Sequence, residues 1–143
     1  MTERYLLDNS AWSRLFHPAL PLHRRSEVAE AIRVGRVHVC LPFLLEAGYS
    51  ARNLDDYRDI TRALHGLPNA AVDEAIEARA VQMQGDLVAC GHHRLPPADL
   101  LIAAIAERHA LTVLHCDKDF DVICDKTSAV ISAEWLAPPD TFS

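Results

Sequence analysis

The sequence predicts an α/β fold in which helices cover both faces of a mostly parallel sheet. Short apolar runs rich in Val and Leu alternate with longer segments that have helical periodicity. This alternation is typical of parallel sheets buried between helices. Half of the 143 residues are hydrophobic, which suffices for a sizeable core. No internal repeat, low-complexity tract or linker interrupts the chain, so we expect one domain over residues 1–143.

The first elements are a strand and two helices. The stretch "RYLLD" at 4–8 is a short apolar run that ends in Asp8 and predicts a buried strand. A short helix is expected over 9–16. Ser26 is a plausible N-cap for a helix over 27–34, which Gly35 would end.

The middle of the chain predicts a second strand followed by two helices. The stretch "RVHVCLP" at 36–42 alternates polar and apolar residues. Pro42 suits the first turn of a helix through 43–52, with Glu46 about one turn inside it. A further helix is expected over 55–66, and the stretch "LPNAA" at 67–71 suggests a short third strand.

The last third predicts three more helices and two strands. Apolar residues recur at helical spacing from Val72 to about Ala89, and a loop follows at 90–96. The apolar stretch 97–109 predicts a helix, and "LTVLHC" at 111–116 predicts a strand that ends at Asp117. A short helix over 119–125 and a strand over 128–132 complete the expected fold.

Composition excludes several classes of function. The formal net charge of −6 argues against binding nucleic acid through a broad basic surface. None of the four cysteines forms a C-x-x-C pair, which favours buried thiols in a reducing compartment. No apolar run is long enough to span a membrane, and the charged N-terminus is unlike a signal peptide. We therefore expect a cytoplasmic protein without a membrane partner.

Carboxylates follow the predicted strands. Asp8 and Asp117 each come directly after a strand, and Glu46 follows the second strand closely. Asp99 shares one helix face with apolar residues three, four and seven positions later, so its carboxylate is expected to face inward. In open α/β sheets, sites form outside the carboxyl ends of the strands, which is where these acids would meet.

Each acid alone has an ordinary structural explanation. Asp99 favours the dipole of its helix, Asp8 could cap the helix that follows it, and an acid such as Asp117 could be a turn residue. Together, however, converging carboxylates repel one another, and burial strengthens the repulsion. A hard cation would neutralise such a group, and oxygen ligands suit Mg²⁺, with Mn²⁺ as a substitute.

Two rival sites are weaker. Cys90, His92 and His93 in "CGHHR" could contribute to a zinc site, but no second well-spaced ligand pair is present. Asp8 at a strand end is also typical of phosphatases with an aspartyl nucleophile, although Ser10 replaces the second acid of their D-x-D pattern. The glycine-rich motifs of dinucleotide and P-loop nucleotide sites do not occur.

The stretches "YLLDNSAW", "LPFLLEAGYSAR" and "PPADLLIAAIAERHALTVLHCDKDFDVI" make the chain resemble PIN-domain ribonucleases, most of all the VapC-type toxins. The resemblance covers nearly the whole chain. It implies a three-layer α/β/α sandwich with an acidic site at Asp8, Glu46, Asp99 and Asp117. Of these, Asp8, Asp99 and Asp117 would bind the metal, while Ser10 and Asp119 would support the site.

The resemblance also implies the function. The chain would be a Mg²⁺-dependent endoribonuclease that hydrolyses RNA phosphodiesters as the toxin of a type II toxin–antitoxin pair. Its implied partners are an RNA substrate, a cognate antitoxin and a second copy in a homodimer. Arg14 and Lys118 are candidate RNA-binding residues. The alternatives are a non-catalytic PIN-like module that binds RNA or protein, and a metal-dependent phosphatase.

Overall fold

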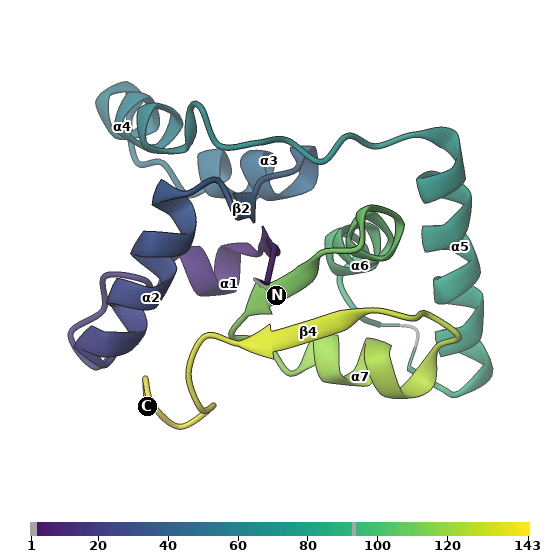
Figure 1. Ribbon diagram of the computed structural model, residues 1–143. Helices are drawn as coiled ribbons and strands as arrows, with labels where there is room; N and C mark the ends of the chain where they lie inside the picture. Colours follow the sequence, from purple (N-terminus) through teal and green to yellow (C-terminus); the bar gives the residue numbers. More distant parts are fainter. Residues whose placement is uncertain (1–2, 93) are drawn as a thin grey trace.

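A four-stranded sheet lies at the centre of the protein (Figure 1). A computed structural model describes residues 3–92 and 94–143. The strands are β1 (Tyr5–Leu7), β2 (Val37–His38), β3 (Thr112–His115) and β4 (Ser132–Trp135), in the spatial order β2-β1-β3-β4. Every pairing between these strands is parallel. The sheet is flanked by helices, and the predicted α/β class is confirmed.

The two central strands, β1 and β3, carry the most apolar sequence of the sheet. Leu6 and Leu7 of β1 and Val113 and Leu114 of β3 are fully or almost fully buried. A strand covered on both faces cannot alternate with polar residues, which is why these runs are continuous. Both central strands end at the same edge of the sheet, and Asp8 and Asp117 follow there.

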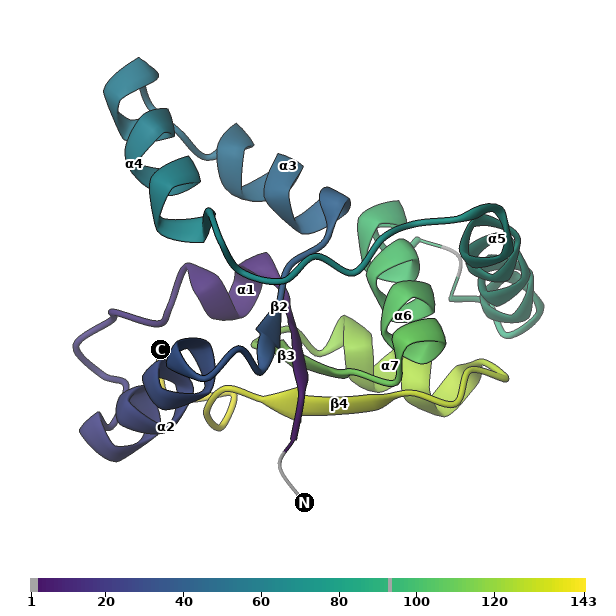
Figure 2. The ribbon, with the colours of Figure 1, turned by 45° about the horizontal axis from the view of Figure 1, so that its top comes forward.

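Seven helices connect and flank the strands in the part of the chain that the structure describes (Figure 2). They are α1 (Asn9–Trp12), α2 (Leu22–Arg33), α3 (Leu41–Tyr49), α4 (Leu54–Leu64), α5 (Glu74–Ala89), α6 (Pro97–His109) and α7 (Asp119–Lys126). Asn53 and Asp73 cap α4 and α5 by accepting hydrogen bonds from backbone N–H groups of the first turn.

Helix α6 is the most deeply buried helix. Its buried residues are Asp99, Leu100, Ile102, Ala103, Ala104, Ile105 and Ala106. Small alanines let α5, α3 and α7 pack closely against it. The predicted inward face of this helix is confirmed, and Asp99 is the one charged residue on it.

Helix α2 begins earlier than the sequence predicted. It starts at Leu22 after Pro21, so Ser26 lies inside the helix and does not cap it. The first turns lack apolar periodicity and are held by tertiary hydrogen bonds. Arg24 donates to the carbonyl of Leu136 at 2.7 Å, and Arg25 donates to the carbonyl of Leu15 at 3.2 Å. Such contacts between distant segments leave no periodic signal in the sequence.

Three smaller predictions were also wrong. The last strand was expected at 128–132, but β4 covers Ser132–Trp135, and the apolar Val130 lies in an exposed loop. The stretch 67–71 forms no strand and contributes one isolated parallel bridge between Asn69 and Val39. The first helix ends at Trp12 and does not reach residue 16.

The buried apolar side chains form one continuous core around β1, β3 and α6. This continuity supports a single domain over residues 1–143, which stays a prediction. Within the described residues, no helix combines the length and the apolar character that crossing a bilayer requires.

Candidate metal centre

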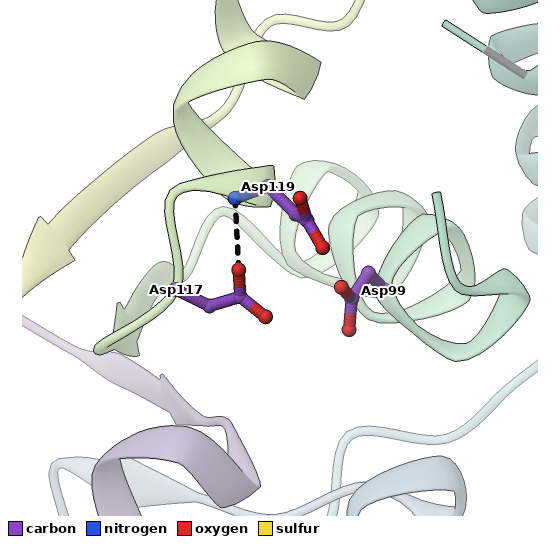
Figure 3. Close-up of side chains that lie close together, drawn as sticks. All are labelled: Asp99, Asp117 and Asp119. Atoms are coloured by element: carbon purple, nitrogen blue, oxygen red, sulfur yellow. Dashed lines mark hydrogen bonds between the residues drawn. The ribbon is translucent and has the colours of Figure 1, made fainter. Parts of the chain in front are cut away.

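Three aspartates meet beside the carboxyl edge of the sheet (Figure 3). Asp99 comes from the first turn of α6, Asp117 follows β3, and Asp119 begins α7. One carboxylate oxygen from each lies within 4.8 Å of the others. Among the described residues, this is the one group of three or more acidic, His or Cys side chains that lie so close together. We call it the aspartate cluster.

The Asp99 carboxylate is the most perturbed group of the cluster. Its side chain is 5% exposed, and Oδ2 has no hydrogen-bond partner among the described residues. Burial is the largest cause that raises the pKa of Asp99, and the negative charges of Asp8, Asp117, Asp119 and Glu46 follow in that order; together they bring this pKa to about 8. A buried carboxylate without a donor is costly unless a cation or a proton compensates its charge.

Asp8 faces the cluster from the other central strand. It is 3% exposed and caps α1 by accepting a hydrogen bond from the backbone N–H of Ser10 at 3.0 Å. The Ser10 hydroxyl donates a second bond to the same oxygen, Oδ2. Burial raises the pKa of Asp8, the two bonds from Ser10 oppose that effect, and the charge of Asp117 adds to it. Asp8 is thus both a helix cap and part of the acidic site.

Glu46 on α3 completes the set of acids that the sequence singled out. Its side chain is half-buried, and its pKa is raised by burial and by the charges of Asp8 and Asp117. Asp8 and Glu46 both lie outside the aspartate cluster. Asp119, which was expected to play a supporting part, lies inside it, where burial and Asp117 raise its pKa.

Asp117 is fixed by its neighbours in the turn after β3. Its Oδ1 accepts a hydrogen bond from the backbone N–H of Asp119 at 2.9 Å (Figure 3). Its own backbone N–H donates to Nδ1 of His115 at 3.2 Å. His115 is fully buried between the rings of Phe120 and Trp135, each with its centroid 5.0 Å away.

Sequence reasoning missed His115. The available signal was one polar residue in the apolar run "LTVLHC", next to the strand-end acid. Trp135 was missed as well, because the last strand was placed four residues too early and the residue fell outside it.

The two candidate RNA-binding residues lie beside the site. Lys118 is exposed between Asp117 and Asp119, and its charge lowers the pKa of Asp119. Arg14 donates a hydrogen bond to the carbonyl of Ser10 at 2.9 Å. The structure thus places Lys118 next to two acids of the cluster and ties Arg14 to Ser10, the partner of Asp8.

The rival zinc site gains no support in the described residues. Cys90 and His92 belong to no group of metal-binding side chains there. The thiol of Cys90 instead donates a long bond of 3.9 Å to the carbonyl of Lys126. His93 lies outside the described residues.

The aspartate cluster fits a hard divalent cation. Its donors are all carboxylate oxygens, which suit Mg²⁺ or Mn²⁺ and not a thiolate-seeking metal. The unpartnered Oδ2 of Asp99 is a ready ligand, because it has no competing hydrogen bond among the described residues. A bound cation would also lower the raised pKa values of Asp99 and Asp119 by favouring their ionised forms.

Comparison with known proteins gives full-length matches. A family model of the PIN domain matches residues 5–126. The ribonuclease VapC21 of Mycobacterium tuberculosis is 37% identical over 143 residues, which cover 99% of each chain. The ribonuclease VapC2 of the same species is 40% identical over 141 residues, covering 96% of each chain.

Solved structures agree at the level of the fold. A DNA-bound VapBC from Salmonella typhimurium gives a TM-score of 0.74 at 18% identity, over 95% of this chain and all of that one. VapBC-5 from Mycobacterium tuberculosis gives a TM-score of 0.63 at 21% identity, over 94% and 98%. The family match and the full-length identities confirm the resemblance carried by the acid-bearing stretches: the chain belongs to the PIN domain family, in the group of the VapC ribonucleases.

Proposed function

We propose that this protein is a metal-dependent endoribonuclease that hydrolyses RNA phosphodiester bonds. The observation that carries the proposal is the buried, unpartnered carboxylate of Asp99 facing Asp117 and Asp119 within 4.8 Å. The similar VapC proteins are named ribonucleases, which supports the same reaction here.

Asp99, Asp117 and Asp119 would hold Mg²⁺, with Asp8 as a further ligand on the side of β1. When bound, the ion lowers the pKa of a water molecule and offsets charge on the phosphate. Ser10 holds Asp8 in place through two hydrogen bonds to Oδ2, which leaves Oδ1, without a hydrogen-bond partner among the described residues, as the oxygen available to a metal ion. Asp8 and Glu46 are the carboxylates available to accept the proton of the attacking water.

We also propose that the protein acts as the toxin of a type II toxin–antitoxin pair in the cytoplasm, as a homodimer with a cognate antitoxin. The support is the similarity to VapC chains, together with the solved VapBC complexes that share the fold. Co-expression with the product of an adjacent gene, followed by purification through a tag on that product, tests this part.

Cleavage of end-labelled total RNA tests the reaction. We expect discrete products with Mg²⁺ or Mn²⁺ that disappear with EDTA and with Asp99→Asn, while Asp125→Asn, an exposed acid on α7, cleaves normally. A folded protein that binds RNA without cutting it would support the non-catalytic module. Turnover of a small phosphomonoester without RNA cleavage would support the phosphatase.

A further inference from the structure

A small cavity is lined in part by the turn that follows β3. It has a volume of about 180 Å³ and is lined mainly by Arg14, Cys116, Trp135, Pro138, Pro139 and Phe142. Cys116 is the residue before Asp117, so the cavity and the cluster share one turn of the chain. Pro138, Pro139 and Phe142 of this lining belong to the segment that follows β4, whose path is seen in Figure 1.

Arg14 supplies a positive charge to this cavity. Its Nη1 donates to the carbonyl of Ser10 at 2.9 Å, and its guanidinium carbon lies 5.8 Å from the centre of the Phe142 ring. Among the described residues, no carboxylate lies within 4.0 Å of its nitrogens. Arg24, by contrast, pairs with Glu134 at 2.6 Å. Arg14 is therefore held in position while most of its N–H groups stay free for an anion.

Trp135 supplies an aromatic wall. Its ring contacts His115 on one side, and its Nε1 donates to the carboxylate of Asp121 at 3.2 Å. These two contacts fix the plane of the indole, which is partly exposed and lines the cavity. Phe142 is fixed in turn by an edge-to-face contact with His17, with ring centroids 5.2 Å apart.

We propose that this cavity is a substrate subsite for one nucleotide of the RNA next to the cleaved phosphodiester. The base stacks on Trp135, and the phosphate of that nucleotide pairs with Arg14. A guanidinium matches two phosphate oxygens, and an aromatic face accepts any base. This inference deepens the proposed function and rests on it.

The subsite would reduce the electrostatic repulsion between an acidic site and an RNA strand. Carboxylates that would hold a cation also repel the other phosphates of an RNA strand, and the chain as a whole carries a formal charge of −6. The fixed cation Arg14, in the cavity that Cys116 also lines, offsets that repulsion where the strand leaves the site. Stacking adds affinity that does not depend on salt.

Binding without cleavage gives the first test. A pool of labelled hexaribonucleotides is titrated with the protein in EDTA at low salt, and fluorescence anisotropy is measured. We expect Arg14→Gln to bind about tenfold more weakly and to reduce the slope of log K against log salt by about one. Arg58→Gln removes an exposed charge from α4, away from the cavity, and should bind as the wild type does.

Tryptophan fluorescence tests the stacking. The chain has two tryptophans, so Trp12→Phe leaves Trp135 as the single reporter. We expect RNA to quench this fluorescence, and we expect Arg14→Gln to weaken the quenching in parallel with the anisotropy. Absence of RNA binding, binding without quenching, or an Arg14→Gln variant equal to the wild type would each overturn the subsite.

Cleavage kinetics separate this inference from the proposed function. For a metal-dependent wild-type enzyme, Arg14→Gln and Trp135→Leu should raise KM about tenfold while kcat changes less than threefold. If the wild type cleaves RNA and both variants have an unchanged KM, the subsite is refuted while the proposed ribonuclease activity stands. If RNA quenches the fluorescence of Trp135 but is not cleaved, the proposed ribonuclease activity is refuted while a nucleotide-binding site stands.

Discussion

Ser10 joins the ends of the two central strands, because its hydroxyl accepts a hydrogen bond from the backbone N–H of Cys116 at 2.8 Å. The same hydroxyl donates to Asp8, the first residue after β1. One small side chain thus fixes the distance between the acid that follows β1 and the turn that carries Asp117. The geometry of the acidic site depends on this bridge as well as on its acids.

The first prediction concerns this bridge. Ser10→Ala leaves the N–H of Cys116 without its partner and releases Asp8, so we expect cleavage to fall about tenfold. An unsatisfied buried donor should cost about 1–2 kcal/mol of unfolding free energy. Ser10→Thr keeps the hydroxyl and should retain most activity and stability. Cleavage rates and denaturant melts of both variants measure this, and full activity of Ser10→Ala would contradict it.

The second prediction concerns the pH dependence of stability in EDTA. The pKa of Asp99 rises from its ordinary 3.8 to about 8 in the folded protein, so folding favours its protonated form. This contribution is fully present below about pH 4 and is lost as the pH rises towards 8. Asp99→Asn should therefore become more stable than the wild type over that window, by about 2 kcal/mol at pH 8 after allowance for screening by water and ions.

Urea melts at several pH values measure this difference. Asp125→Asn serves as the control because its carboxylate is exposed on α7, and its difference from the wild type should stay small at every pH. If the stability of Asp99→Asn relative to the wild type is constant from pH 4 to pH 8, the pKa of Asp99 is not raised in the folded protein, and the prediction is wrong.

The sequence predicted most of the fold and the places of three acids in it, and particular residues show why. Apolar runs at β1 and β3, and the apolar face of α6, carry their own periodic signal, so Asp8, Asp99 and Asp117 could be placed before the structure was known. The start of α2 and the place of β4 could not be predicted. Arg24 in the first turn of α2 donates hydrogen bonds to Glu134 of β4 and to Leu136 just after it, and so holds the two elements together. Such pairing between distant segments leaves no local pattern in the sequence.

The distances between the acids could not be predicted from the sequence either. The family resemblance implied Asp8, Asp99 and Asp117 as the metal ligands, whereas the tightest group contains Asp119 in place of Asp8. The hydrogen bond from the N–H of Asp119 to Asp117 turns the start of α7 towards Asp99. That turn is a matter of backbone geometry, and the string "DKDF" alone does not determine it.

The third prediction concerns metal binding itself. Adding Mg²⁺ or Mn²⁺ should raise the melting temperature of the wild type by several degrees, because the ion binds the folded state and relieves repulsion in the cluster. Asp119→Asn should reduce this shift strongly, whereas Asp125→Asn on the same helix should leave it unchanged. Thermal melts with and without the ion measure the shift. Equal shifts in both variants would exclude Asp119 as a ligand.

The last prediction concerns His115, whose Nδ1 accepts the backbone N–H of Asp117 while its buried Nε2 has no partner among the described residues. His115→Phe keeps a ring between Phe120 and Trp135 but removes the acceptor that orients Asp117. We expect the Mg²⁺ concentration for half-maximal cleavage to rise several-fold. Stability should stay close to that of the wild type, because losing the unsatisfied Nε2 offsets the cost of leaving the N–H of Asp117 without its acceptor. An unchanged Mg²⁺ midpoint in the folded variant would show that Asp119 alone suffices to hold Asp117.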